Sequence, residues 1–448
     1  MQTHERTSMP QEQLLYRKIL WRLLPFILLC YFICYLDRVN IGFAKLKFLT
    51  DLNLTDANYG FATALFFVTY SLFDIPSNLL LAKIGVRKTL TRIMVIWGIL
   101  SAMQMFIQSA SHLYALRLLF GAAEAGFIPG IMLYLTYWFP NALRGRVTSL
   151  FLLGIPISGM IGAPLSGAIM QNMQGTLSLH GWQWLFLIEA LPAIVIGVAA
   201  FFYLDDTPAE ARWLSAEEKS LLASRLAEDR KHGTHAQAQS LRAMLHDPRL
   251  YLIAAVNFSV NCVTNAVSFW TPSILKSVGV ANVGHIGWLT GGISAIGALG
   301  MVLVSQHSDR TMERHLHFTV PGLLAAASFV ALPLARDSVA GTVALMMCAM
   351  FGCYTILALY WTIPTAYMQG KSAAGGLAFV SMVGAIGSGV SPSIIGWLKV
   401  QTGSLYSGMF VMGIVGIAGV VLVWMAIPPA KMRLAQKRAM ANGPSAES

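Results

Sequence analysis

Charged side chains are scarce in this sequence, because Asp, Glu, Lys and Arg make up only 11% of its 448 residues. Soluble globular domains carry about 25% charged residues, so the composition excludes an ordinary water-soluble protein. Hydrophobic residues account for 56% of the chain, a share typical of a protein embedded in a lipid bilayer.

Groups that carry out covalent or metal chemistry are also scarce. The five cysteines all lie in apolar runs, and no histidine or acid follows them at the spacing of metal ligands. We therefore expect neither a disulfide nor a metal site. The sequence has no Ser/His/Asp set and no glycine-rich nucleotide loop, which argues against a membrane enzyme and an ATP-driven pump. No cofactor is predicted.

Long polar segments are few. The first eighteen residues are polar without a cleavage-site pattern, so no removable signal peptide is expected. Residues 204–247 form the one long polar segment between apolar runs, and they are too few for a signalling domain. Within them, Ser215 and Glu218 have the spacing of a capping box, which predicts a helix to about His232 with Gly233 as its stop.

Apolar runs of about 20 residues, the length that crosses a hydrocarbon layer of about 30 Å, are abundant. Twelve such runs predict an all-α membrane protein with twelve transmembrane helices. The predicted spans are 21–43, 58–82, 90–109, 112–138, 147–170, 182–203, 249–271, 285–305, 317–335, 339–362, 374–397 and 406–427.

The predicted spans form two pseudo-symmetric bundles of six. Small residues cluster in the fifth and eleventh spans, where Pro164 and Pro392 lie 228 positions apart. Such residues let helices approach closely, and two related halves fit a transporter that rocks one half against the other. The predicted organisation is a tail at 1–18, a bundle at 19–203, a linker at 204–247, a bundle at 248–427 and a tail at 428–448.

Lysine and arginine concentrate in the two tails and in every second loop, which predicts that both termini lie in the cytoplasm. The net charge of +11 is spread over these short segments, so it does not predict binding to nucleic acid. The basic residues include Arg17, Lys18, Arg87, Lys88, Arg144, Arg146, Arg310, Arg314, Lys371 and Lys431.

Ionisable residues lie within the predicted spans of the first half only. They are expensive at membrane depth and by default mark a pathway for an ion or a substrate. They are Asp37, Arg38, Asp74, Arg117, Glu124 and Glu189.

Arg38 and Arg117 are candidates for an anion clamp, because a guanidinium grips a carboxylate through two parallel hydrogen bonds. Glu124 lies two helical turns from Arg117 on the same face, and the first and fourth spans are assumed to be neighbours. Protonation of Glu124 would then free Arg117 for a substrate anion, with Asp37 as a second proton-coupling candidate. The alternative is a set of buried ion pairs that only fixes helix packing.

Asp74 lies in the tail-side half of the second span. We expect it to pair with basic loop residues such as Arg87 or Arg146, in a cytoplasmic gate or in a structural role. Glu189 is expected to hold a helix contact and is assigned no role in transport.

Polar residues replace charges in the second half. Asn257, Asn261 and Asn265 form one helical stripe, which serves either as contact between helices or as contact with substrate. Ser381 on the eleventh span is a candidate donor to the substrate, and Trp361 is a candidate wall of the pocket.

The whole chain resembles the major facilitator superfamily, and within it the anion:cation symporter branch. The resemblance rests on residues 35–43 (YLDRVNIGF), 74–78 (DIPSN), 117–130 (RLLFGAAEAGFIPG), 182–186 (WQWLF) and 269–272 (FWTP). It implies proton-driven uptake of an organic carboxylate across a bacterial inner membrane. Substrates of the branch include sugar acids, tartrate, phthalate and hydroxyphenylacetate.

The resemblance also assigns roles to residues. By this resemblance, Asp37 and Glu124 match acids that are implicated in proton coupling. Arg38 and Arg117 match arginines that are implicated in substrate binding and gating. Residues at Tyr70 and Trp361 match aromatic side chains that line the pocket. The chain departs from the superfamily in the loop after the second span, where Ala82 replaces the usual aspartate. Asp74 is then the candidate acid of the cytoplasmic gate.

We therefore expect a secondary transporter, acting as a monomer among membrane lipids, that imports a small organic anion together with protons. The alternative is a proton-driven antiporter that exports drugs or metabolites. Two arginines in the cavity disfavour a cationic drug.

Overall fold

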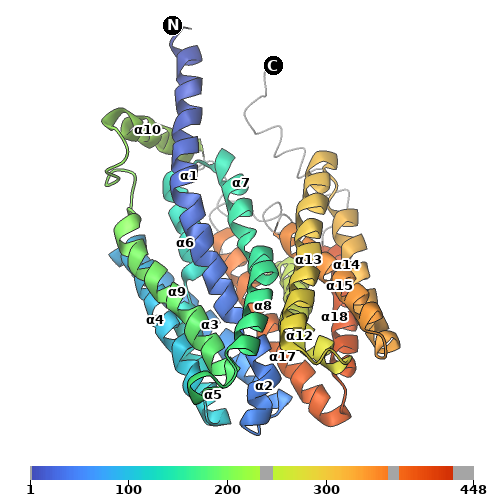
Figure 1. Cartoon of the computed structure of the whole chain (residues 1–448). Helices are drawn as coiled ribbons and strands as arrows, with labels where there is room; N and C mark the ends of the chain where they lie inside the picture. The colour runs from blue at the N-terminus through green and yellow to red at the C-terminus, as the bar shows by residue number, and fades with distance from the viewer. Residues whose placement is uncertain (1–2, 233–245, 362–372, 427–448) are drawn as a thin grey trace.

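The computed structural model describes residues 3–232, 246–361 and 373–426, and within them twelve helical segments are long and apolar enough to cross a membrane. Figure 1 shows them side by side in two groups. The helices of the first group are α1 (Thr3–Val39), α2 (Ile41–Asp51), α3 (Asp56–Ile84), α4 (Val86–Met103), α5 (Ala110–Glu124), α6 (Phe127–Trp138), α7 (Asn141–Leu152), α8 (Gly154–Asn172) and α9 (Gly181–Tyr203).

The second group contains the remaining spans, and α10 lies between the two groups in sequence. These helices are α10 (Ala216–His232), α12 (Pro248–Ser277), α13 (Val283–Thr311), α14 (His315–Ala331), α15 (Val339–Tyr360), α17 (Ala373–Thr402) and α18 (Leu405–Ala426). The predicted spans and the all-α fold class are confirmed. The predicted tail 428–448, Gly233 with linker residues 234–245, and Lys371 lie outside the described residues.

The first helix begins before the first predicted span. α1 is helical from Thr3 onward, so it includes residues that the sequence assigns to the polar tail. Its early part contacts α10, because Lys18 pairs with Glu218 at 2.8 Å and Arg225 pairs with Glu12 at 2.9 Å. The predicted capping box is confirmed, since the Ser215 backbone N–H donates to Glu218 and the Glu218 N–H donates to the Ser215 hydroxyl.

Breaks divide the first, fourth and fifth spans, which the sequence predicted as continuous. They fall at Asn40, at Ala125 with Gly126, and at Leu153. Gly126 has a φ of 86°, a conformation that favours glycine, and its backbone N–H donates to Asp74 Oδ1 at 3.0 Å. The break therefore follows directly after Glu124, at the end of α5.

An even number of spans places the start of α1 and the end of α18 at the same end of the molecule, which lies uppermost in Figure 1. We call this the tail end and the opposite one the far end. Most of the contact between the halves is made by α8 with α13 and by α3 with α17, and α2 also contacts α12. The two main contacts are equivalent in the two repeats, since each pairs the fifth helix of one half with the second helix of the other.

Glycine permits these close contacts between the halves. A Cβ atom on Gly287 of α13 would lie 2.6 Å from the carbonyl oxygen of Ala163 on α8. A Cβ atom on Gly60 of α3 would lie 2.5 Å from the carbonyl oxygen of Pro392 on α17. Both separations exclude a side chain. Among the small residues predicted in the fifth span, Gly167 of α8 likewise meets backbone of the opposite half, because a Cβ atom on it would lie 2.8 Å from the carbonyl oxygen of Val283 on α13.

Polar and aromatic contacts close the far end between the halves. Asp56 of α3 forms an ion pair with Lys399 of α17, and Lys45 of α2 lies 3.9 Å from the same carboxylate. The Lys45 ammonium group lies 3.2 Å from the ring centroid of Trp270 on α12 and 4.0 Å from that of Tyr59. A buried cation is stabilised by such aromatic faces, so these groups bind the far ends of the bundles together.

Removing the charge of Lys399 is expected to loosen this closure. In the Lys399→Met variant, amide hydrogens in residues 40–60 and 268–280 should exchange about fivefold faster, since a partly exposed ion pair contributes about 1 kcal/mol. Hydrogen–deuterium exchange measured by mass spectrometry checks this. Lys47→Met is the matched control, because Lys47 is exposed at the same end. Equal exchange in Lys399→Met and the wild type would contradict the assignment.

Candidate functional site

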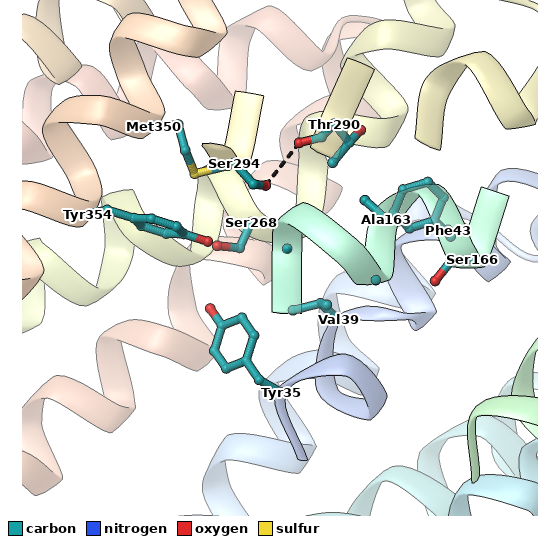
Figure 2. Close-up of a pocket in the computed structure, with 12 residues that line it drawn as sticks. Tyr35, Val39, Phe43, Ala163, Ser166, Ser268, Thr290, Ser294, Met350 and Tyr354 are labelled. Carbon is teal, nitrogen blue, oxygen red and sulfur yellow. Dashed lines mark hydrogen bonds between the residues drawn. The ribbon is translucent and has the colours of Figure 1, made fainter. Parts of the chain in front are cut away.

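A pocket lies between the two halves and contains about 400 Å³ of empty space, including space open to solvent. The first half contributes side chains from α1, α2 and α8, and the second half contributes side chains from α12, α13 and α15 (Figure 2). The lining residues are Tyr35, Val39, Phe43, Gly159, Gly162, Ala163, Ser166, Ser268, Thr290, Ser294, Met350 and Tyr354.

Hydroxyl groups give the pocket its polar character. Figure 2 shows the hydroxyls of Tyr35 and Tyr354 directed toward Ser268. The hydroxyl of Thr290 is buried and has no hydrogen-bond partner among the described residues, whereas that of Ser268 is buried beside the two tyrosine hydroxyls. Unsatisfied buried hydroxyls are costly, and a bound molecule with polar atoms would satisfy them. Sequence reasoning missed Tyr35, Ser268 and Thr290, because nothing in their spacing separates them from packing residues.

A buried ion pair lies beside this pocket. The Arg38 guanidinium contacts Glu124 Oε1 in a close ion pair, with its Nε donating to the same oxygen at 3.0 Å. The side chain of Glu124 is 1% exposed and that of Arg38 is 12% exposed. Cys34 also donates to Glu124 Oε1, at 3.2 Å. The assumed neighbourhood of the first and fourth spans is therefore confirmed.

Aromatic rings surround the Arg38 guanidinium. Its central carbon lies 5.2 Å from the ring centroid of Tyr70, 5.6 Å from that of Phe66 and 6.0 Å from that of Tyr35. Tyr35 also lines the pocket, so one side chain touches both the pocket and the ion pair. Tyr70, which the resemblance placed on the pocket wall, does not line this pocket and lies instead at the Arg38 guanidinium. Such rings stabilise a cation whose partner is lost.

Arg117 does not pair with Glu124, which corrects the predicted competition between these two residues. Arg117 is 2% exposed, and its Nε and Nη2 atoms are buried without a hydrogen-bond partner among the described residues. Glu124 is held by Arg38 from the neighbouring helix. An unpaired buried guanidinium is energetically unfavourable, so Arg117 is the cation in this region that is free to take an anion.

Asp37 faces a different direction from Arg38. Its carboxylate accepts hydrogen bonds from Trp97 Nε1 at 3.0 Å and from the Ser101 hydroxyl at 3.0 Å, both on α4. It also accepts from Asn40 Nδ2 at 3.4 Å. Asp37 therefore bonds toward α4 while Arg38 bonds to Glu124 of α5, because successive side chains on a helix point about 100° apart.

The predicted pairing of Asp74 with Arg87 or Arg146 is wrong in this structure. Asp74 accepts from the backbone of Gly126, and Arg146 is exposed. The Arg87 guanidinium covers the ring of Phe201. Its backbone N–H donates at 2.8 Å to Asp206, just after α9. The sequence search missed Asp206 because it lies far along the chain, in the linker. A gating role for the three predicted residues stays a prediction.

The asparagine stripe of α12 contacts α17. Asn265 donates to the Ser388 hydroxyl at 3.1 Å, Ser388 donates to Asn261 Oδ1 at 3.1 Å, and Asn257 donates to the Val380 carbonyl at 2.9 Å. The sequence left open whether this stripe contacts other helices or the substrate. These hydrogen bonds are contacts between helices. Ser381 is exposed and Trp361 is partly buried, and neither lines the pocket. Substrate contact by Asn261, Asn265, Ser381 and Trp361 stays a prediction.

The model of the Major Facilitator Superfamily matches residues 27–392. The chain belongs to this superfamily. It is therefore a membrane transporter and not an enzyme, and the family suspected from the sequence is confirmed.

Curated relatives of this transporter are similar over most of their length. "Putative metabolite transport protein NicT" of Pseudomonas putida is 40% identical over 89% of this chain and 91% of the relative. "Putative tartrate transporter" of Agrobacterium vitis is 41% identical over 92% and 91%. "Quinolone resistance transporter" of Acinetobacter baumannii is 35% identical over 91% and 94%.

A solved structure shares the fold of this transporter. The crystal structure of a D-xylose-proton symporter superposes with a TM-score of 0.73, at 14% identity over 92% of this chain and 99% of that one. The twelve-helix architecture in two halves is therefore that of the superfamily.

The two arginines are expected to respond in opposite ways to the same substitution. Arg38→Met should lower the free energy of unfolding by about 3 kcal/mol, because it leaves the Glu124 carboxylate buried without a cation. Arg117→Met should raise the midpoint of thermal unfolding in the absence of ligand, because it removes an unpaired buried charge. Thermal unfolding of both variants in detergent checks this pair of outcomes. A drop in stability for Arg117→Met would show that its guanidinium has a stabilising partner.

Proposed function

We propose that this transporter imports a small organic carboxylate together with protons. The observation that carries the proposal is the buried ion pair of Arg38 and Glu124, with an unpaired Arg117 nearby and a hydroxyl-lined pocket beside it. Two guanidiniums suit a carboxylate substrate, and one titratable acid bound to a guanidinium suits coupling to a proton.

Coupling follows from competition for one cation. While Glu124 is ionised, it holds Arg38 and keeps a substrate carboxylate from binding there. Protonation of Glu124 removes its charge, weakens the ion pair and makes Arg38 available to the substrate. Arg117, whose two nitrogens lack partners, contributes the second cation. Substrate binding and proton binding then favour each other, as symport requires.

The hydroxyls of the pocket orient the remainder of the substrate. Thr290 has an unsatisfied hydroxyl, and Ser268, Tyr35 and Tyr354 present theirs together in the same pocket. These groups hydrogen-bond to the hydroxyl or second carboxyl groups of a hydroxy acid. Met350 and Phe43 supply apolar wall beside them. The proposed substrate class is therefore a hydroxylated carboxylate, and the name of the relative from Agrobacterium vitis agrees with this class.

Closure at the far end defines one state of the proposed transport cycle. We place the tail end in the cytoplasm because of the distribution of lysine and arginine, with the transporter in the inner membrane as a monomer. The contacts of Asp56, Lys399 and Lys45 then close the outer side. An importer releases its substrate and proton to the cytoplasm from a state closed on the outer side, and an exporter loads its substrate in such a state. The direction is therefore decided by the response of transport to external acid.

Export by proton antiport is the second candidate, favoured by the similarity to the quinolone resistance transporter. The two functions differ in the response to acid outside vesicles. External acid drives accumulation inside by a symporter, whereas it drives expulsion by an antiporter. Uptake of labelled carboxylates into proteoliposomes with external acid distinguishes them.

Neutralising Glu124 is expected to uncouple the protein. Glu124→Gln keeps the size of the side chain but cannot cycle a proton, so proton-driven accumulation of carboxylate should fall at least about tenfold while counterflow exchange continues. Both are measured in proteoliposomes with a labelled carboxylate. If Glu124→Gln concentrates substrate as strongly as the wild type under a proton gradient, Glu124 is not a coupling residue.

A further inference from the structure

A second pair of carboxyl groups lies behind the pocket, away from Arg38. Asp37 of α1 and Glu189 of α9 are 0% and 1% exposed, and Asn40, which is 0% exposed, lies between α1 and α2. Asn40 Nδ2 donates to Asp37, and its side chain also lies within hydrogen-bonding reach of Glu189. The site described above uses Glu124 as its acid and leaves Glu189 without a role.

Ser166 connects this pair of acids to the pocket. It is one of the residues that line the pocket, and its hydroxyl donates to Glu189 Oε1 at 2.6 Å. It lies on α8, the helix that also forms the contact with α13 of the other half. Motion of one half against the other would therefore change the surroundings of Ser166 and, through it, those of Glu189.

The hydrogen bonds around the two carboxyls differ. Asp37 accepts from Trp97, Ser101 and Asn40, which suits an ionised carboxylate. Glu189 accepts from Ser166, while its Oε2 atom is buried without a partner among the described residues, as is Asn40 Oδ1. Glu189 Oε2 therefore has no donor that would stabilise a negative charge on it, and a proton on Glu189 removes the charge that burial makes costly.

The charges around Glu189 also favour a proton. Asp37 is the charged group that acts on it from α1, and that charge has the same sign. Two neighbouring buried carboxyls resist simultaneous ionisation. Several other polar or charged side chains on the helices packed near Glu189 contact different groups. Trp97 and Ser101 of α4 donate to Asp37, and Arg92 of α4 donates to Ser77. Lys45 of α2 lies over the ring of Trp270, and Asp51 of α2 accepts from Trp182.

We propose that Glu189, paired with Asp37 through Asn40, is a second proton-binding site of the transporter, filled from the pocket through Ser166. A proton that arrives at Ser166 Oγ displaces the hydroxyl's own proton onto Glu189 Oε1, to which that hydroxyl donates, so Ser166 ends neutral and only O–H bonds change. The inference rests on the proposed proton symport and adds a proton carrier separate from Glu124. It predicts two coupled protons for each substrate molecule.

Steady-state accumulation counts coupled protons. With a pH gradient of one unit and no membrane potential, each coupled proton contributes about tenfold to the accumulation ratio of the substrate, because one pH unit corresponds to about 1.36 kcal/mol. Glu189→Gln should therefore lower the ratio about tenfold in proteoliposomes and leave counterflow exchange intact. A ratio equal to that of the wild type would overturn the proposal, whatever the outcome for Glu124→Gln.

Ser166→Ala tests the route of the proton. It removes the relay hydroxyl but leaves Glu189 in place, so proton-driven uptake should slow while the final accumulation ratio stays near the wild-type value. Ser158→Ala is the matched control on α8, because the Ser158 hydroxyl is buried and bonds only to the backbone carbonyls of Phe32 and Gly154. Equal uptake rates in Ser166→Ala and Ser158→Ala would show that the proton reaches Glu189 by another route and would overturn this part.

An infrared measurement reads the proton without transport. The carboxylic-acid C=O band of the purified protein at neutral pH should lose intensity in Glu189→Gln. It should shift in Asn40→Leu, which removes the amide side chain beside Glu189 and provides a second variant if Glu189→Gln does not fold. Loss of the band supports the site even if the wild type shows no proton-driven uptake, in which case only the proposed symport fails. A band unchanged in both variants overturns the site.

Discussion

The attraction between Arg38 and Glu124 is the interaction on which the rest of the arrangement depends. Both groups are removed from water, so neither can lose its partner without a replacement. A substrate carboxylate replaces Glu124 as the partner of Arg38, and a proton neutralises Glu124 at the same time. The ring of Tyr35 beside the guanidinium connects this exchange to the pocket.

The fold places this exchange where motion of the halves can act on it. The break after Glu124 ends α5 at the depth of the ion pair, and Gly126 fixes that break through Asp74. The far end is held by Asp56, Lys399 and Lys45, whereas the contact helices α8 and α17 meet the opposite half through glycine. Close backbone contact with few interlocking side chains permits one half to rock against the other.

The sequence predicted the fold well because hydrophobic length and small-residue contacts are local signals. It also identified Arg38, Arg117 and Glu124, since charges in apolar runs stand out without an alignment. It assigned the wrong partner to Glu124, because helical spacing relates Arg117 to Glu124 within one helix but does not report the rotation of α1 against α5. Ser268, Thr290 and Asp206 were missed for the same reason, as their roles arise only from contacts across the fold.

The pH dependence of carboxylate binding tests the central claim most directly. Affinity is measured on purified wild type and on Glu124→Gln, without a membrane gradient. If Glu124 must take up a proton to release Arg38, the affinity of the wild type for the carboxylate falls as pH rises. That one proton lowers the affinity by up to about tenfold per pH unit. The account predicts that the carboxylate affinity of Glu124→Gln falls less steeply with pH, by the contribution of one proton. The variant therefore still binds the carboxylate tightly at high pH. A variant that keeps the wild-type dependence would contradict the account.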